Sequence, residues 1–368
     1  MEVIVNERKQ DKMRNVVLKN IQIAAISCAA PTNQTDANDY VEHFGEKRVK
    51  RFVKTTGVKK RYLGNGKQTA ADFCCVAARN IFVEKNIRPE DVGVLIYLTQ
   101  NPDYQTPSTA FVIQKRLGIS KECICFDINM GCTSFLHGIS VAGSMMMSGI
   151  GKVALVMMGD ARLPHGVTDD TTETMIFGEA GAVVALTRGE GEIPIDLFSD
   201  GNHFDWIMNP YGERMRKENG EFDLSTFFDY MDGSQVFDFS VTRVPKAIRA
   251  FCEENDLSLE EYDSLILHQA NVFILKHIAN ELDLSLDKVW ISMDRYGNTN
   301  GASIPVTIVD YVENQDDLPE RLNFLVSGFG IGLSWGVMSI NIETKNILPM
   351  CFTDEYYEEA KDLSCFHG

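Results

Sequence analysis

Three side chains that could carry covalent chemistry each stand where an apolar run gives way to a helical pattern: Cys132, His268 and Asn298. A thiol at the start of a helix faces unpaired amides and the positive end of the helix dipole, which favours the thiolate. A cysteine with a histidine and an asparagine distant in sequence is a candidate nucleophile constellation, although this spacing also suits a cysteine hydrolase. Taken singly, residues of these types are more often a packing thiol, a structural imidazole and a turn amide.

Short apolar runs alternate with helical patterns in both halves of the chain, which is typical of an α/β sheet protein. We expect strands at Val94–Leu98, Ile124–Ile128, Val153–Met158, Ser264–Leu267, Val289–Ile291 and Asn323–Val326. The repeated strand–helix order predicts an internal duplication. Because open α/β sheets place their sites at the carboxyl ends of strands, the three residues above are expected to lie at such edges.

This pattern divides the chain into four parts. Residues 1–190 form the half with the candidate nucleophile, and residues 236–344 form the half with the histidine and asparagine. A loop-rich connection, 191–235, joins them, and residues 345–368 are expected to be an appended tail.

Composition excludes several classes of protein. The 368 residues are 44% hydrophobic and 24% charged, which rules out a disordered or collagen-like chain. A net charge of −17 argues against sequence-independent nucleic-acid binding. The first residues are charged where a signal peptide needs an apolar run, and no stretch approaches ~18 apolar residues. We therefore expect a cytoplasmic protein with no membrane or nucleic-acid partner.

The nine cysteines lack the paired CxxC spacing of a zinc site, so no metal site is expected. Cys123 and Cys125 form a CxC pair in an apolar stretch, which indicates buried thiols on a strand rather than ligands. Reduced cysteines are expected in an intracellular protein.

The sequence motifs around the three candidate residues resemble those of the ketoacyl-ACP synthase III family of thiolase-fold condensing enzymes, and the resemblance runs from about residue 20 to residue 341. The matching motifs are TTGVKKRY (55–62), NPDYQTPSTA (101–110), FDIN before Cys132, FGEAGA (177–182), YMDGSQVFDF (230–239), HQAN (268–271), YGNTNGASIP (296–305) and GFGIGLSWG (328–336). The resemblance implies a five-layered αβαβα thiolase-like fold made of two duplicated halves, and a homodimer.

The resemblance also implies the roles of the three residues. Cys132 takes an acyl group from a thioester, while His268 and Asn298 stabilise the enolate oxygen left when a malonyl thioester loses CO2. The oxyanion hole for the acyl carbonyl is assigned to the backbone amides of Cys132 and Ile331.

Three further positions are assigned to substrate binding: Phe237, Gly330 and Asn271. Phe237 lines the acyl passage in this reading, with a plain core position as the alternative. No cofactor is bound permanently, because CoA or 4′-phosphopantetheine thioesters are the substrates, and the partner is an acyl-carrier protein or acyl-CoA.

The chain departs from the words of relatives that prime from acetyl-CoA. The Trp that such relatives carry before the TGI-like word is missing from residues 47–52, and no Arg follows Asp170. The sequence therefore predicts a 3-oxoacyl-ACP synthase III-like acyltransferase of a specialised fatty-acid or polyketide-like pathway, with a carrier-bound or unusual acyl donor. The alternatives are non-condensing acyl transfer to an alcohol or amine and, more remotely, an inactive module that binds acyl thioesters.

Eight positive charges gather between Lys47 and Arg61 in an otherwise acidic chain. Local potential can outweigh net charge when a partner docks. We therefore expect an acidic carrier to dock on Lys50, Arg51 and Lys54, with a solvated helix face as the alternative.

Overall fold

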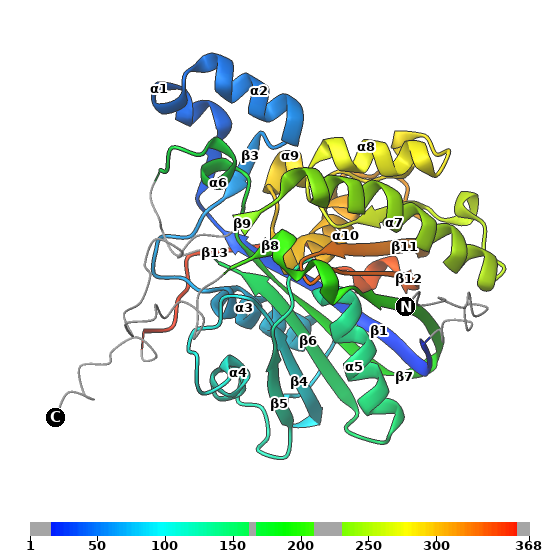
Figure 1. The fold of residues 1–368 in the computed structure, drawn as a ribbon. Helices are drawn as coiled ribbons and strands as arrows, with labels where there is room; N and C mark the ends of the chain where they lie inside the picture. The colour runs from blue at the N-terminus through cyan, green and yellow to red at the C-terminus, as the bar shows by residue number, and fades with distance from the viewer. Residues whose placement is uncertain (1–15, 162–166, 210–229, 359–368) are drawn as a thin grey trace, which may run out of the picture.

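Two long strands, β1 (Val16–Pro31) and β7 (Ala180–Ser199), pair antiparallel and connect the two halves of a single sheet. The computed structural model describes residues 16–161, 167–209 and 230–358 (Figure 1). Its nine-stranded sheet has the order β10-β11-β12-β7-β6-β4-β5, with β1 on β7 and β13 on β1. The other strands of this sheet are β4 (Val92–Leu98), β5 (Ile124–Ile128), β6 (Val153–Asp160), β10 (Ser264–Leu267), β11 (Arg321–Gly330), β12 (Ser334–Glu343) and β13 (Cys351–Thr353).

The two halves repeat one topology. In the first half β5, β4 and β6 are parallel and β7 closes antiparallel; in the second, β10 and β11 are parallel and β12 closes antiparallel. The place equivalent to β5 is taken by Val289, which meets Leu265 of β10 in a single parallel bridge. The strand expected at Val289–Ile291 is therefore reduced to that bridge.

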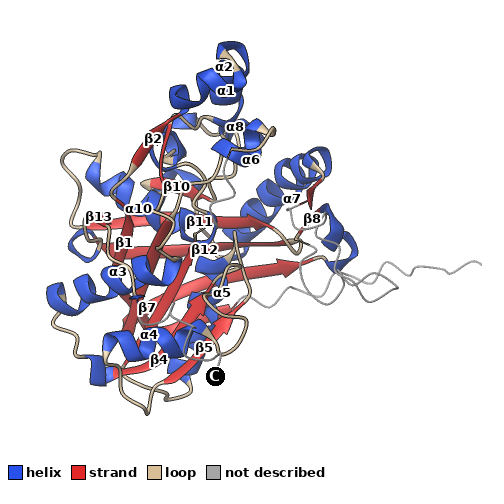
Figure 2. Ribbon diagram, turned by 90° about the vertical axis from the view of Figure 1, so that its left-hand side faces the viewer, coloured by secondary structure: helices blue, strands red, loops and turns tan. Residues whose placement is uncertain are grey.

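Helices fill the space between the half-sheets and cover both outer faces (Figures 1 and 2). The helices of the described ranges are α1 (Val41–Phe44), α2 (Glu46–Thr56), α3 (Ala70–Glu84), α4 (Thr109–Leu117), α5 (Ser134–Met147), α6 (Thr171–Met175), α7 (Gly233–Glu254), α8 (Val272–Glu281), α9 (Met293–Tyr296) and α10 (Ser303–Glu313), of which α1 and α2 project beyond the sheet (Figure 1). Two small ladders, β2 (Gln34–Asp36) with β3 (Lys60–Tyr62) and β8 (Ile207–Met208) with β9 (Tyr230–Met231), lie outside the main sheet.

Alternating side chains of each strand enter different layers, as the pleat requires. In β4, Ile96 packs in the central cluster with α5 and α10, whereas Leu95 and Tyr97 pack outward with α3 and α4. In β11, Phe324 joins the same central cluster, while Leu325 faces α7 and α8. The layers therefore run helix, sheet, helix, sheet, helix, in the five-layered αβαβα order that was predicted.

The segment expected to be a tail begins inside the fold. β13 extends the sheet beside β1, with Ala29 opposite Cys351. Gln68 Nε2 donates to the carbonyls of Thr353 and Glu355 at 3.0 Å each. Residues 359–368 lie outside the described residues. In the expected connection, β7 extends to Ser199 and β8 pairs with β9, while residues 210–229 are not described.

Within the described ranges, none of the helices has the length and apolar character needed to cross a bilayer. The eight cysteines of these ranges are free thiols, and Cys123 and Cys125 are buried, as expected.

Candidate active site

Cys132 lies in the turn between β5 and α5, against the glycine-rich turn that follows β11. A Cβ atom on Gly330 would lie 2.8 Å from Cys132 Sγ, so the two segments are in direct contact. The backbone N–H of Ile331 lies near enough to the Cys132 thiol to lower its pKa. The structure therefore brings together the thiol and the amide predicted for the oxyanion hole.

The thiol is not poised as a thiolate. Burial raises the pKa of Cys132 to about 11, and the charge of Asp160 acts in the same direction. The Ile331 N–H lowers the pKa, but by less than burial raises it. The expected preference for the thiolate was wrong for the free protein, because desolvation of the thiolate raises the pKa by more than the backbone amides lower it.

His268 follows β10 directly and is buried. Its Nδ1 lies 2.7 Å from Ser303 Oγ at the start of α10, and its ring meets Phe329 edge-on with centroids 5.7 Å apart. Burial lowers the pKa of His268 to about 3, so the imidazole is neutral near pH 7. A neutral imidazole whose Nδ1 accepts from a hydroxyl carries its proton on Nε2 and can donate it to a substrate oxygen.

Asn298 is held by backbone hydrogen bonds to the segment before β7. Its N–H donates to Ile176 O at 2.8 Å, and the N–H of Gly178 donates to Asn298 O at 3.1 Å. Its side-chain Oδ1 accepts from the N–H of Asn300 at 2.9 Å. This fixes the carboxamide by its oxygen and leaves Nδ2 as the donor.

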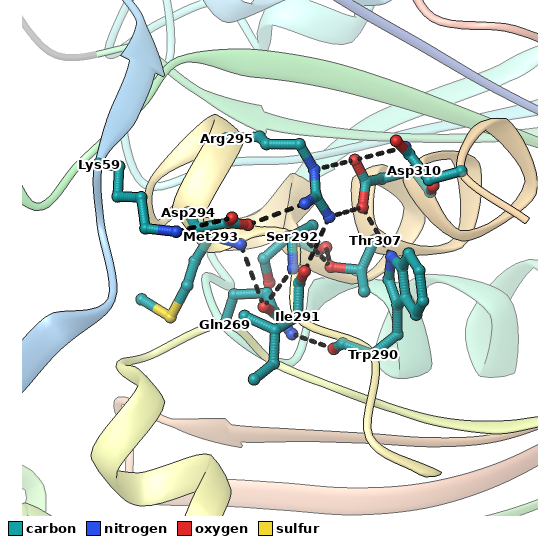
Figure 3. A network of polar contacts seen from close by, with 12 residues as sticks. Lys59, Gln269, Trp290, Ile291, Ser292, Met293, Asp294, Arg295, Thr307 and Asp310 are labelled. Carbon is teal, nitrogen blue, oxygen red and sulfur yellow. Dashed lines mark hydrogen bonds and ion pairs between the residues drawn. The ribbon is translucent and has the colours of Figure 1, made fainter. Parts of the chain in front are cut away.

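Gln269, next to His268, connects that loop to the segment before Asn298 (Figure 3). Its Oε1 accepts from the N–H of Ser292 at 3.1 Å, and its Nε2 donates to Leu267 O at 2.8 Å. Gln269 is 1% exposed, so these bonds are shielded from water.

A buried carboxylate on α10 anchors the same segment (Figure 3). Asp310 accepts from Arg295 Nε at 2.7 Å and from Trp290 Nε1 at 2.6 Å. Arg295 also donates to Ile291 O at 2.8 Å. The path that leads from β10 to Asn298 is thus fixed by charge-assisted bonds.

The glycine-rich turn is tied to α5 through hydroxyl groups. Thr133 Oγ1 lies 2.9 Å from Ser334 Oγ, and Ser334 Oγ donates to Ile331 O at 2.8 Å. The sequence analysis did not single out Thr133, Ser334 or Ser303, although all three lie inside or beside the motifs on which the resemblance rests.

The other predicted substrate-binding residues lie around α7 and α8. Asn271 caps α8, because its Oδ1 accepts from the N–H of Ile274 at 2.8 Å. Phe237, in α7, packs on Phe273 and His277 with ring centroids 5.2 Å apart in both cases. Their contact with substrate stays a prediction.

The predicted docking residues lie on the exposed face of α2, whose Val49 and Phe52 are buried beneath. Lys50 pairs with Glu46 at 2.5 Å across one helical turn. Counting Arg61 among the surface charges was wrong. Arg61 is 5% exposed, since it donates inward to Phe177 O and Tyr40 Oη.

Comparison with known proteins identifies the family of this chain. Residues 126–201 match the family described as 3-oxoacyl-[acyl-carrier-protein (ACP)] synthase III, and residues 252–342 match its C-terminal part. Beta-ketoacyl-[acyl-carrier-protein] synthase III of Clostridium acetobutylicum is 33% identical over 285 residues, covering 77% of this chain and 87% of that protein. The chain belongs to the 3-oxoacyl-ACP synthase III family.

Other members are similarly related. Beta-ketoacyl-[acyl-carrier-protein] synthase III 1 of Vibrio parahaemolyticus is 33% identical over 287 residues, covering 77% of this chain and 88% of that protein. The crystal structure of a 3-oxoacyl-(acyl-carrier protein) synthase from Burkholderia xenovorans superposes with a TM-score of 0.84 at 28% identity, covering 93% of this chain and 99% of that one. The predicted family, thiolase-like fold and acyltransferase class are confirmed.

Proposed function

We propose that this 3-oxoacyl-ACP synthase III-like enzyme forms an acyl-enzyme on Cys132 and then condenses the acyl group with a malonyl thioester. The observation that supports this most directly is the contact of Gly330 and the Ile331 amide with Cys132 Sγ. A thiol that lies this close to a backbone N–H supports a nucleophile with an oxyanion donor beside it.

In the acylation step, Cys132 Sγ attacks the thioester carbonyl, and the bond to the departing pantetheine sulfur breaks. The N–H groups of Cys132 and Ile331 are the donors available for the oxyanion that develops. The raised pKa of Cys132 means that the thiol loses its proton only as the thioester is attacked.

In the condensation step, loss of CO2 from the malonyl thioester leaves an enolate, whose carbon attacks the acyl group and releases Cys132. The enolate oxygen needs donors that stay neutral, since a cationic imidazole would be too costly in a buried site. His268, with its lowered pKa, and the Nδ2 group of Asn298 meet this need.

The donor is proposed to be carrier-bound, because the chain lacks the Trp and Arg described above. The exposed face of α2, with Lys50, Arg51 and Lys54, is the proposed landing surface for an acidic acyl-carrier protein. A specialised fatty-acid or polyketide-like pathway and a cytoplasmic location remain proposals.

A homodimer is proposed as well. β5 is the last strand of its half-sheet and pairs with β4 alone among the described strands. Ile124 on β5 and Phe111 on α4 are 42% and 50% exposed, which are large values for apolar side chains. An unpaired edge strand with exposed apolar neighbours suits pairing with a second copy.

The test is intact-mass analysis after incubation with acyl-CoA and acyl-carrier thioesters. Wild type should gain the acyl mass, and Cys132→Ala should not, while Cys75→Ala and Cys252→Ala serve as controls. An adduct that persists in Cys132→Ala would refute the assignment.

Condensation is tested separately by CO2 release from malonyl thioesters. His268→Ala and Asn298→Ala should lower it about 10²-fold, the scale for losing one oxyanion donor, while Cys132 still accepts acyl groups. If wild type acylates an alcohol or amine and releases no CO2, the non-condensing alternative holds.

A further inference from the structure

The thiol of Cys132 is engaged by a side chain outside the predicted catalytic positions. Cys132 Sγ donates to Asn300 Oδ1 at 3.5 Å, and Asn300 Nδ2 donates to Gln100 Oε1 at 3.0 Å. Asn300 adopts φ +47°, and its N–H is bonded to Asn298 Oδ1. The carboxamide is therefore fixed through its backbone and through its own amide group.

The main chain of Gln100 is itself held in place. Its N–H donates at 2.8 Å to Asp160 Oδ1, which also accepts from Thr99 Oγ1 at 3.0 Å. A Cβ on Gly131 would lie 2.5 Å from Gln100 Oε1, so the Gln100 amide packs against the turn that precedes Cys132. Because Gln100 turns its oxygen toward Asn300 Nδ2, Asn300 must turn its own oxygen toward the thiol.

We propose that Asn300 is a positioning residue for acylation, which holds the Sγ proton of Cys132 in a fixed direction, and that Gln100 sets the direction of its carboxamide. The inference rests on the proposed role of Cys132 as nucleophile. With S–H directed at Asn300, a sulfur lone pair is left for the thioester carbonyl.

The proton inventory of this step is simple. A carboxamide oxygen accepts a hydrogen bond but is too weak a base to take the proton. The Sγ–carbonyl bond forms, the bond from that carbon to the pantetheine sulfur breaks, and the Sγ proton ends on the departing sulfur. Nothing is oxidised or reduced.

Several groups set the background against which Asn300 acts. Asp160, from β6, raises the pKa of Cys132, and the N–H groups of Ile331 and of Cys132 itself lower it. His268, from the loop after β10, is the other titratable member of the proposed site and is neutral near pH 7. Exchanging Asn300 for another neutral residue leaves these groups in place.

The experiment follows alkylation of the Cys132 peptide by iodoacetamide against pH, by mass spectrometry on the full-length protein. Asn300→Gly removes the carboxamide and suits the positive φ. The midpoint of the pH profile of Cys132 alkylation should fall by about 0.5–1 pH unit, since a hydrogen bond made by the protonated thiol is lost. Single-turnover acylation should slow about tenfold. Asn86→Gly is the matched control, because Asn86 has φ +49° and is exposed.

Two further variants separate positioning from loss of packing. Gln100→Leu fills similar space but frees Asn300 to rotate its amide toward the sulfur, so the midpoint should also fall. Asn300→Asp keeps an acceptor and adds negative charge, so the midpoint should rise. Midpoints equal to wild type in Asn300→Gly and Gln100→Leu would overturn the inference.

The two proposals fail in distinguishable ways. Alkylation needs no substrate, so an unchanged midpoint overturns the role of Asn300 and leaves that of Cys132 standing. An acyl adduct that survives in Cys132→Ala refutes the nucleophile, whatever the alkylation profile of Asn300→Gly.

Discussion

Ser303 Oγ lies 2.7 Å from Nδ1 of His268, and both residues are buried. Ser303 is the first residue of α10, the helix that packs between the two half-sheets, and His268 directly follows β10. One hydroxyl therefore joins the histidine of the site to the central layer and fixes the orientation of its ring.

Removing that hydroxyl should affect condensation and spare acylation. In Ser303→Ala the imidazole loses the hydrogen bond that orients its ring, so CO2 release from a malonyl thioester should fall about tenfold, somewhat less than the loss of a whole oxyanion donor. Ser303→Thr keeps the hydroxyl and serves as the control. Equal loss of acylation in Ser303→Ala would show that the change damages the fold instead.

The rate of decarboxylation should not follow the ionisation of a histidine with an ordinary pKa. Burial lowers the pKa of His268 from 6.5 to about 3, so the neutral donor persists throughout pH 5–8 and is lost only as the pH falls toward 3. The CO2-release rate at saturating malonyl thioester, corrected for stability, should show no acid limb near 6.5. A limb there that disappears in His268→Gln would contradict the neutral imidazole.

The backbone at Gly330 should tolerate no side chain. A Cβ there would lie 2.8 Å from Cys132 Sγ, at φ +156°. Gly330→Ala should therefore displace the thiol from the Ile331 amide and lower acylation about 10²-fold, the scale of a misplacement near 1 Å. Gly201→Ala is the control, because a Cβ at Gly201 meets no atom within 4 Å. Normal acylation by Gly330→Ala would mean that this turn does not form the oxyanion hole.

Local patterns located the nucleophile but not its environment. The strand expected at Ile124–Ile128 has the bounds of β5, because an apolar run followed by a tight turn and a helix is a local signal. The pKa of Cys132 was misjudged, since burial by β11 and η8 (Asn300–Ala302) comes from segments far away in sequence. The contact of Asn300 with Cys132 spans 168 positions and leaves no periodic trace.

The sequence analysis also did not predict the long antiparallel pairing of β1 with β7. β1 runs for 16 residues, but Lys19, Asn20 and Gln22 interrupt its apolar pattern. Its register with β7 joins positions such as Ala29 and Gly181, so the signal is entirely long-range.

Arg116 should contribute strongly to stability through a buried ion pair. Its guanidinium bridges Asp72 at 3.0 Å and Asp103 at 3.2 Å, and all three side chains are 3–6% exposed. Arg116→Met leaves two buried carboxylates without that partner, which should cost about 3–5 kcal/mol in urea unfolding.

The comparison for that measurement is Arg79→Met. Arg79 pairs with Glu355 at the surface, where such pairs contribute about 0–1 kcal/mol. Similar unfolding midpoints for the two variants would contradict a buried ion-pair role for Arg116.

Carrier docking gives a prediction that depends on salt. Lys50, Arg51 and Lys54 lie on the exposed face of α2, so reversing all three to Glu should leave the core beneath them intact. Acylation by an acidic acyl-carrier thioester should then fall steeply, while acylation by a small pantetheine thioester should be retained. The difference should shrink as salt rises, because exposed charges are screened beyond about 8 Å at physiological ionic strength.

The matched control reverses Lys121 and Lys152, which are exposed in the loops before β5 and β6. This control makes two charge reversals, against three in the α2 variant, and it leaves α2 untouched, so it should not distinguish the two donors. Equal loss with both donors in the α2 variant would indicate damage to the fold. Full carrier-dependent activity in the α2 variant would mean that the carrier docks elsewhere. The next variant to measure would then be Lys276→Glu, on the exposed side of α8. This helix adjoins α2, since a Cβ on Gly57 at the end of α2 would lie 2.9 Å from Val272 of α8.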